Sequence, residues 1–251
     1  MLEHTHAAAE VMAPAHTVGP GSMPAMPPTA LERAIADGYP LDLREVLRDA
    51  LRHLKGSKRV IVGGALIWLA ITLVVGWITL ALGMGNAPSG ALGVLATAPL
   101  TVGLVMVGAR RAAGQPVTPA DLWAYRGVTA HAAIVMLVNL LVVLGSEAVF
   151  GPVASLPLTI VYGLFTSLAL YLVADRGLSG GRAILASAQL VRHRWAALLL
   201  LQLLLAGLLA LSVLTLGIGL IWTGPFAVLA QGAVYVRAVG MADTEVRPSP
   251  R

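Results

Sequence analysis

The residue types that carry most enzyme chemistry are sparse in this chain and form no recognisable constellation. Cysteine is absent. His53, His131 and His193 are far apart, and no two have the spacing of metal ligands on one helix. Glu147 has no second acid near it in the sequence, so no partner is available for acid–base catalysis by paired carboxylates. We therefore predict no catalytic residue, no metal site and no cofactor, and we do not expect an enzyme.

Three amides inside long apolar stretches remain as a candidate polar site: Asn139, Gln202 and Gln231. Such side chains either hydrogen-bond between helices, which is the more common role, or line a substrate path. The apolar stretches around them lack Asp, Lys and Arg, and their one acid, Glu147, falls in an expected loop. A proton- or ion-coupled pump is therefore disfavoured, because charged groups mark most such pathways.

Three prolines recur at similar places in the apolar stretches: Pro99, Pro157 and Pro225. A proline removes a backbone donor and kinks or caps a helix, and we expect this structural role for all three. A kink beside a cavity is also how transporters form binding sites, so that alternative stays open.

Composition explains why apolar stretches dominate the chain. Of its 251 residues, 57% are hydrophobic and 12% are charged, against about 25% charged in soluble domains. There are too few charged residues to cover a protein of this size in water. The net charge of +5 comes from residues beside the apolar stretches, so we expect a lipid bilayer, and not nucleic acid, as the partner.

Three segments are nearly free of charge: 60–109, 128–174 and 195–236. A helix crosses a bilayer in about 20 residues, so each segment is long enough to cross twice. Each is therefore expected to form a helical hairpin. The predicted fold is an all-α, polytopic bundle of six transmembrane helices in three hairpins, with short cytoplasmic amphipathic helices before them.

The basic residues give these hairpins an orientation. With three hairpins, every Lys and Arg beside them falls on one side, and the opposite loops have none. This distribution follows the positive-inside rule and predicts that both ends of the chain are cytoplasmic.

Outside the hairpins, composition predicts two tails and an amphipathic helix. Residues 1–40 are rich in Ala, Pro, Met and His and are expected to be a disordered cytoplasmic tail whose histidines are solvated. Residues 241–251 are expected to be a cytoplasmic C-terminal tail, and 41–240 the transmembrane domain.

The amphipathic helix, 41–56, carries basic residues away from its apolar stripe: Arg44, Arg48, Arg52 and Lys55. It either lies among lipid headgroups, where these residues attract anionic lipids, or packs its stripe on the protein's own helices. The sequence weighs these alternatives equally.

The layout of short helix and hairpin returns twice, which suggests an internal repeat. Thr118, Pro119 and Asp121 have the pattern of an N-cap, a first-turn proline and an N3 acid, and Ser179 can cap a further segment.

A resemblance to known proteins rests on several short motifs. These are Ala-Pro-Leu-Thr-Val-Gly at 98–103, Gly-Ala-Arg-Arg-Ala-Ala-Gly at 108–114, Asp175, 183–187, Trp195, Leu-Gly-Ile-Gly-Leu at 216–220, Pro225 and Tyr235. Over about 43–240 the chain resembles bacterial six-helix membrane proteins catalogued as domains of unknown function. The resemblance implies a bacterial cytoplasmic membrane location and transfers no catalytic residue.

Two classes of function stay open on this basis. The first is a non-enzymatic membrane scaffold or lipid-organising module, which the uncharged helices and basic segments favour. The second is a facilitator or transporter of a small or lipid-like solute, which the prolines and amides favour. Convergence of Asn139, Gln202 and Gln231 on one water-accessible cleft would indicate the second. The sequence leaves a protein partner and the oligomeric state undetermined.

Overall fold

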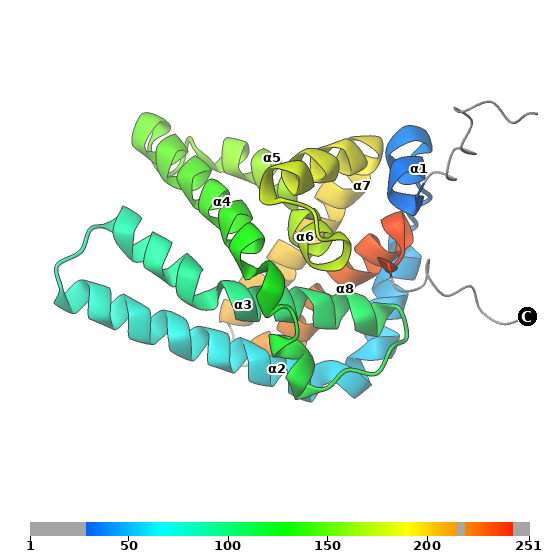
Figure 1. Cartoon of the computed structure of the whole chain (residues 1–251), viewed down its shortest axis with the longest axis horizontal. Helices are drawn as coiled ribbons and strands as arrows, with labels where there is room; N and C mark the ends of the chain where they lie inside the picture. The colour runs from blue at the N-terminus through cyan, green and yellow to red at the C-terminus, as the bar shows by residue number, and fades with distance from the viewer. Residues whose placement is uncertain (1–28, 215–218, 243–251) are drawn as a thin grey trace, which may run out of the picture.

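The computed structural model describes residues 29–214 and 219–242 (Figure 1). Within these residues the chain is helical and contains no strand. The helices are α1 (Ala30–Asp37), α2 (Leu43–Ala81), α3 (Asn86–Ala112), the 3-10 helices η1 (Pro119–Trp123) and η2 (Arg126–Val128), α4 (Thr129–Phe150), α5 (Leu156–Thr166), α6 (Ala169–Arg176), α7 (Gly180–Leu214) and α8 (Leu220–Val239). The all-α prediction is confirmed for this part of the chain, while 1–28 and 243–251 of the expected tails lie outside it.

Among the residues that the structure describes, five helical segments are long and apolar enough to span a membrane: Ser57–Ala81, Asn86–Ala112, Pro119–Phe150, Leu156–Arg176 and Gly180–Ser212. They correspond to five of the six expected crossings. The sixth corresponds to α8, which is not among these segments. Most residues in the second half of α8 are buried by the rest of the protein.

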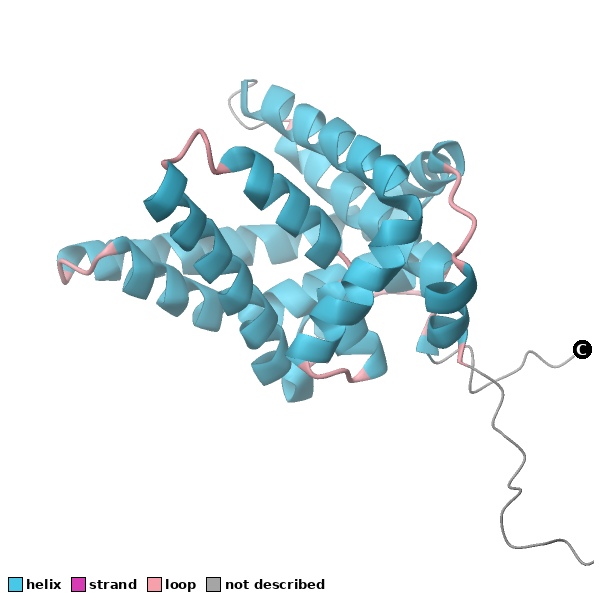
Figure 2. Ribbon diagram, turned by 90° about the horizontal axis from the view of Figure 1, so that it is seen from above, coloured by secondary structure: helices cyan, strands magenta, loops and turns pink. Residues whose placement is uncertain are grey.

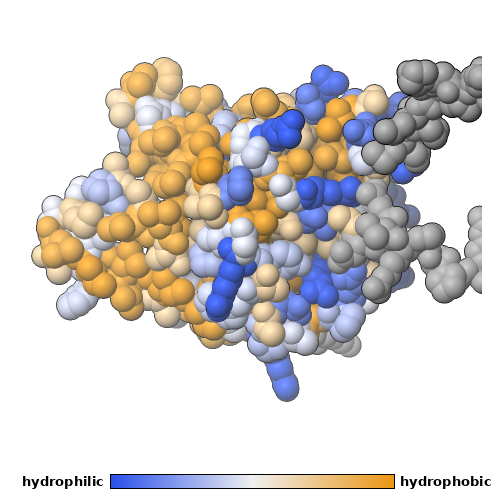
Figure 3. All heavy atoms as spheres, viewed as in Figure 1, coloured by the Kyte–Doolittle hydropathy of each residue, from blue (hydrophilic) through white to orange (hydrophobic). Residues whose placement is uncertain are grey.

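The spanning-length helices leave their apolar side chains uncovered at one end of the molecule. The turn between α2 and α3 projects beyond the other helices, and α1 lies at the opposite end (Figures 1 and 2). Trp77 and Leu80 near this turn are 72% and 78% exposed. Hydrophobic surface covers the projecting hairpins, and hydrophilic surface gathers towards α1 (Figure 3). We name the two ends the apolar end and the charged end.

Helix α1 lies inside the stretch assigned to the disordered tail. Its N-terminus has a capping box, in which Thr29 Oγ1 accepts the Glu32 N–H at 3.3 Å and the Glu32 carboxylate accepts the Thr29 N–H at 2.8 Å. The Thr-x-x-Glu signature was present in the sequence, but eight residues are too short to show a helical period clearly. Ordered chain therefore begins before the expected boundary at residue 40.

The amphipathic helix and the first apolar segment form one continuous helix, α2. Asp42 caps it by accepting the Arg44 N–H at 2.8 Å. Val46 and Ala50 on its apolar stripe are fully buried, and α2 packs along α8. Of the two alternatives for this segment, the structure has the stripe packed on the protein itself.

The second short segment is also ordered, as a 3-10 helix and not as an amphipathic α-helix. The expected cap is present, because Asp121 accepts the Thr118 N–H at 2.6 Å and also pairs with Arg110 at 2.6 Å. Helix α7 begins directly after Ser179 and is interrupted at Arg194, whose backbone is not helical. This kink separates 180–193 from the apolar segment 195–214.

Helices α3 and α8 approach so closely that their backbones touch. A Cβ on Gly232 would lie 2.6 Å from the backbone nitrogen of Ala109, and one on Gly108 would lie 2.6 Å from the Val228 carbonyl oxygen. Small residues at such crossings let helices pack by dispersion forces alone. Glycine at both positions is thus a steric requirement of the fold.

This requirement predicts the effect of adding one methyl group. Gly232→Ala should destabilise the protein by about 1–3 kcal/mol, because the backbones of α3 and α8 must separate. Thermal unfolding of the purified protein in detergent measures it. Gly207→Ala is the matched control, since a Cβ there meets no atom within 4 Å. Equal unfolding temperatures for the two variants would contradict the close crossing.

Candidate functional site

The first of the three expected amides, Asn139, is paired with a neighbouring helix. Its side-chain oxygen accepts the hydroxyl of Thr166 on α5 at 3.1 Å, and its amide nitrogen donates to the Val135 carbonyl at 2.8 Å. A hollow of about 330 Å³ lies beside this pair, bounded by α3, α4, α5 and α6. Its wall is mostly apolar, with residues such as Val94, Met136 and Leu170.

The other two amides face each other. Gln231 Nε2 of α8 donates to Gln202 Oε1 of α7 at 3.5 Å. The gap around them is about 10 Å³, which is at the lower limit for one water molecule. Gln202 and Gln231 therefore act as an interhelical hydrogen bond in a nearly closed contact.

The structure thus does not bring the three amides into one cleft. Asn139 pairs with Thr166, and Gln202 pairs with Gln231. Asn139 lines the larger hollow, and the two glutamines line the small gap. Ser167, at the end of α5, borders both. A substrate path along all three amides would have to pass this residue.

The three prolines occupy different positions in their helices. Pro99 and Pro225 lie inside α3 and α8, and Pro157 lies in the first turn of α5. In its first-turn position Pro157 costs no intrahelical hydrogen bond. Beside Pro99, Thr101 donates to the Thr97 carbonyl at 2.9 Å and accepts Trp68 Nε1 of α2 at 3.1 Å.

A cluster of ion pairs at the charged end was not expected from the sequence. Arg237 in the last turn of α8 bonds Glu45 and Asp49 of α2, each at 2.6 Å. The two acids are four residues apart and so lie on one face of α2. No local pattern links Arg237 to these acids, because 188 residues separate it from Asp49.

A second polar cluster joins α6 to α8. Asp175, whose side chain is 5% exposed, accepts the Tyr235 hydroxyl at 2.6 Å and the Ala242 N–H at 3.1 Å. The Tyr235 ring stacks on Tyr171, with centroids 5.0 Å apart. Arg176 donates to the Val239 carbonyl at 3.1 Å. These bonds hold the end of α8 against α6.

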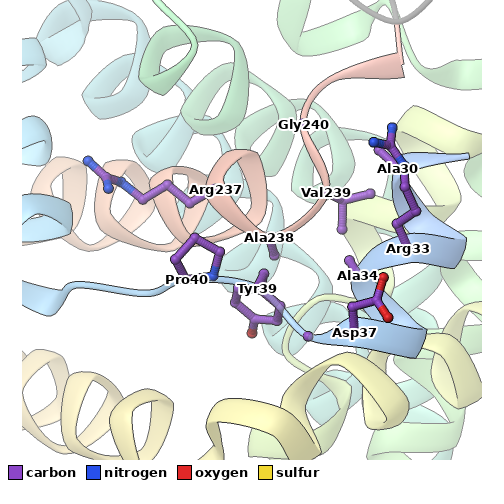
Figure 4. Close-up of a pocket in the computed structure, with 11 residues that line it drawn as sticks. Ala30, Arg33, Ala34, Asp37, Tyr39, Pro40, Arg237, Ala238, Val239 and Gly240 are labelled. Carbon is purple, nitrogen blue, oxygen red and sulfur yellow. The ribbon is translucent and has the colours of Figure 1, made fainter.

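A hollow of about 360 Å³ opens at the charged end between α1, residues 38–40 and the end of α8 (Figure 4). Arg33 and Asp37 project from α1 on one side of it, and Arg237 lies on the other. Burial raises the pKa of Tyr39 to about 12, although nearby Arg194 opposes the shift. The phenol is therefore neutral at physiological pH and is not a base for catalysis.

His193, near this end, contacts the backbone of α1. His193 Nε2 lies 2.9 Å from the Ile35 carbonyl oxygen of α1, and Arg194 Nε donates to the Tyr39 carbonyl at 3.0 Å. The kink of α7 thereby holds α1 and the segment after it. Among residues 29–214 and 219–242, no group of three His, Asp or Glu side chains could hold a metal ion.

Comparison with known proteins adds no assignment, since no protein-family model, curated protein or solved structure matches the chain. The resemblance to six-helix bacterial families therefore stays a prediction.

The pairing of Asn139 with Thr166 predicts an energetic coupling between the two side chains. In a double-mutant cycle of Asn139→Leu and Thr166→Val, we expect a coupling of about 0.6 kcal/mol, the average for such bonds between membrane helices. Chemical unfolding in detergent micelles measures it. Gln202→Leu with Thr166→Val is the control cycle, because no hydrogen bond joins these residues, and its coupling should be near zero. Equal coupling in the two cycles would contradict the assignment.

Proposed function

We propose that this chain is a multi-pass protein of the bacterial cytoplasmic membrane, with both termini in the cytoplasm, that serves as a non-enzymatic scaffold or lipid-organising module. One observation carries the proposal. The amides among the apolar helices are satisfied by partners within the protein as two separate pairs, whereas the charged end presents basic side chains to its surroundings. The proposed contacts with lipid are therefore on the surface and not along an internal path.

The arrangement of the apolar helices supports a bilayer as the surroundings. Five segments have the length and composition of spans, and their exposed leucine, valine and tryptophan side chains would be unfavourable in water. The basic residues lie at the opposite end from the turn at 83–85, which has no charge. Placing the charged end in the cytoplasm satisfies the positive-inside rule.

A basic stripe on α2 supports contact with anionic lipid. Arg44, Arg48 and Arg52 recur every four residues, so they share one face, and all three are exposed. The opposite side of this segment is buried at Val46 and Ala50, which turns the arginines outward. Each basic residue near an anionic surface contributes on the order of 1 kcal/mol. Lys55, the fourth basic residue expected here, has a side chain outside the described part.

Facilitated passage of a lipid-like solute is the second candidate, and the hollow beside Asn139 is the observation that favours it. About 330 Å³ of mostly apolar space with one amide and two hydroxyls, those of Thr166 and Ser167, suits an apolar molecule with a small polar group. The bond between Asn139 and Thr166 counts against passage, because it already uses the polar groups that would recognise the solute.

The basic stripe gives the test of the scaffold proposal. We expect the triple variant Arg44→Gln, Arg48→Gln and Arg52→Gln to lose most of the enrichment of phosphatidylglycerol over phosphatidylcholine around the reconstituted protein. The loss should be tenfold or more at low salt, since three charges near the surface are removed. Mass spectrometry of lipids retained by the purified protein measures the enrichment.

The control removes the same charge elsewhere, through Arg33→Gln, Arg182→Gln and Arg192→Gln, all exposed positions outside α2. It should retain more of the enrichment than the stripe variant does. Equal enrichment in the stripe variant and the unaltered protein would overturn the lipid-organising role. Solute entry into proteoliposomes that Asn139→Leu abolishes would favour the facilitator instead.

A further inference from the structure

We infer that the hairpin of α7 residues 195–214 and α8 does not cross the bilayer, but lies at its cytoplasmic face with its leucines among the acyl chains of that leaflet. This inference rests on the proposed membrane location and deepens it, because it names the lipid surface that the hairpin occupies. It differs from the six crossings expected from the sequence. The evidence is where the two helices touch the rest of the protein.

Along its whole length, α8 contacts the charged end of the α2–α3 hairpin. In its first turn, Trp222 lies under the Lys58 ammonium, 2.9 Å from the ring centroid. In its middle, Gly232 meets Gly108, two residues before the basic end of α3. In its last turn, Arg237 bonds Asp49. Both ends of α8 are thus fixed beside the charged segment of α2.

If α8 crossed the bilayer beside α2, its first turn would not lie beside Lys58. From Lys58 to Ala81, where α2 ends, the chain advances 23 residues, or about 35 Å of helix. That distance exceeds the roughly 30 Å of a hydrocarbon core. The first turn of α8 would lie near Leu82 if α8 crossed beside α2. Figure 1 shows α8 on the side of α1, with the turn between α2 and α3 extending well beyond it.

Residues 195–214 of α7 also begin and end at the charged end. Their first residue follows Arg194, which is bonded to the Tyr39 carbonyl beside α1. Near their end, Ser212 shares a hydrogen bond of 2.9 Å with Thr223, the neighbour of Trp222. This segment therefore begins and ends beside residues of the charged end, although α7 has the length and composition of a span.

The hairpin nevertheless requires an apolar partner. It has no charged residue from 195 to 236, and Leu200, Leu211 and Leu214 are 61%, 63% and 80% exposed. Leucine side chains exposed to this extent are unfavourable in water, and tryptophan and lysine side chains such as Trp222 and Lys58 are favoured at the membrane interface. The acyl chains of the cytoplasmic leaflet are the partner that this position offers.

Topology is consistent with this arrangement. The apolar segments from α2 to α6 cross four times and return the chain to the cytoplasm, and the surface hairpin keeps it there. Both termini and every basic residue remain on one side, as in the six-crossing arrangement. The hairpin adds apolar volume to one leaflet only. The insertion of the hairpin into that leaflet should therefore depend on lipid packing and curvature.

The absence of cysteine makes the test direct, because single-cysteine variants carry one label each. In intact cells, a membrane-impermeant maleimide should label Met84→Cys and Val153→Cys, at the turns of the first two hairpins. Leu220→Cys and Arg182→Cys should be labelled only after permeabilisation. Labelling of Leu220→Cys from outside as fast as Met84→Cys would overturn the inference. Failure to label Met84→Cys and Val153→Cys from outside would instead overturn the proposed membrane topology.

A distance measurement decides the case in which lipid shields Leu220→Cys from the maleimide on both sides. Pulsed electron paramagnetic resonance on spin labels at Arg59→Cys and Leu220→Cys should give a shorter distance than the pair Met84→Cys and Leu220→Cys. The reverse order is the result expected of a crossing hairpin and would overturn the inference. Both pairs use the full chain in proteoliposomes.

Discussion

The contact between the backbones of α3 and α8 is the constraint on which the rest of the structure depends. Gly108 and Gly232 allow α8 to lie directly against the charged end of the α2–α3 hairpin. From that position α8 brings Arg237 to Asp49, Tyr235 to Asp175 and Gln231 to Gln202. A side chain at either glycine would move α8 outward and weaken all of these bonds together, because a single rigid helix carries their partners.

Separation of charge along the molecule follows from the same arrangement. The acids of α2 meet Arg237, and Asp121 meets Arg110, so the charged end is held by ion pairs that are partly shielded from water. Within the described residues, the apolar end shows no such pairs and is held by side-chain packing and by bonds such as that from Trp68 to Thr101. Each end thus uses the interactions suited to its proposed surroundings, water and headgroups at one and hydrocarbon at the other.

Several polar side chains connect one element of the fold to another. Asn139, Gln202, Gln231, Asp175 and His193 each have a partner on another element. Besides the apolar end, the described surface includes a basic stripe on α2 and an uncovered apolar face on α7. We propose both as surfaces for lipid.

The sequence by itself determined the helical class, the apolar segments, the cap at Thr118 and the separation of basic residues from the turn at 83–85. These features depend on hydropathy and on hydrogen bonds over three or four residues, which can be read locally. It also identified the amides but not their pairing, because Thr166 and Gln231 reach their partners across 27 and 29 residues. Only the tertiary structure decided where α8 lies: hydropathy records that a helix is apolar, whereas its position depends on which neighbours its glycines and its last arginine meet.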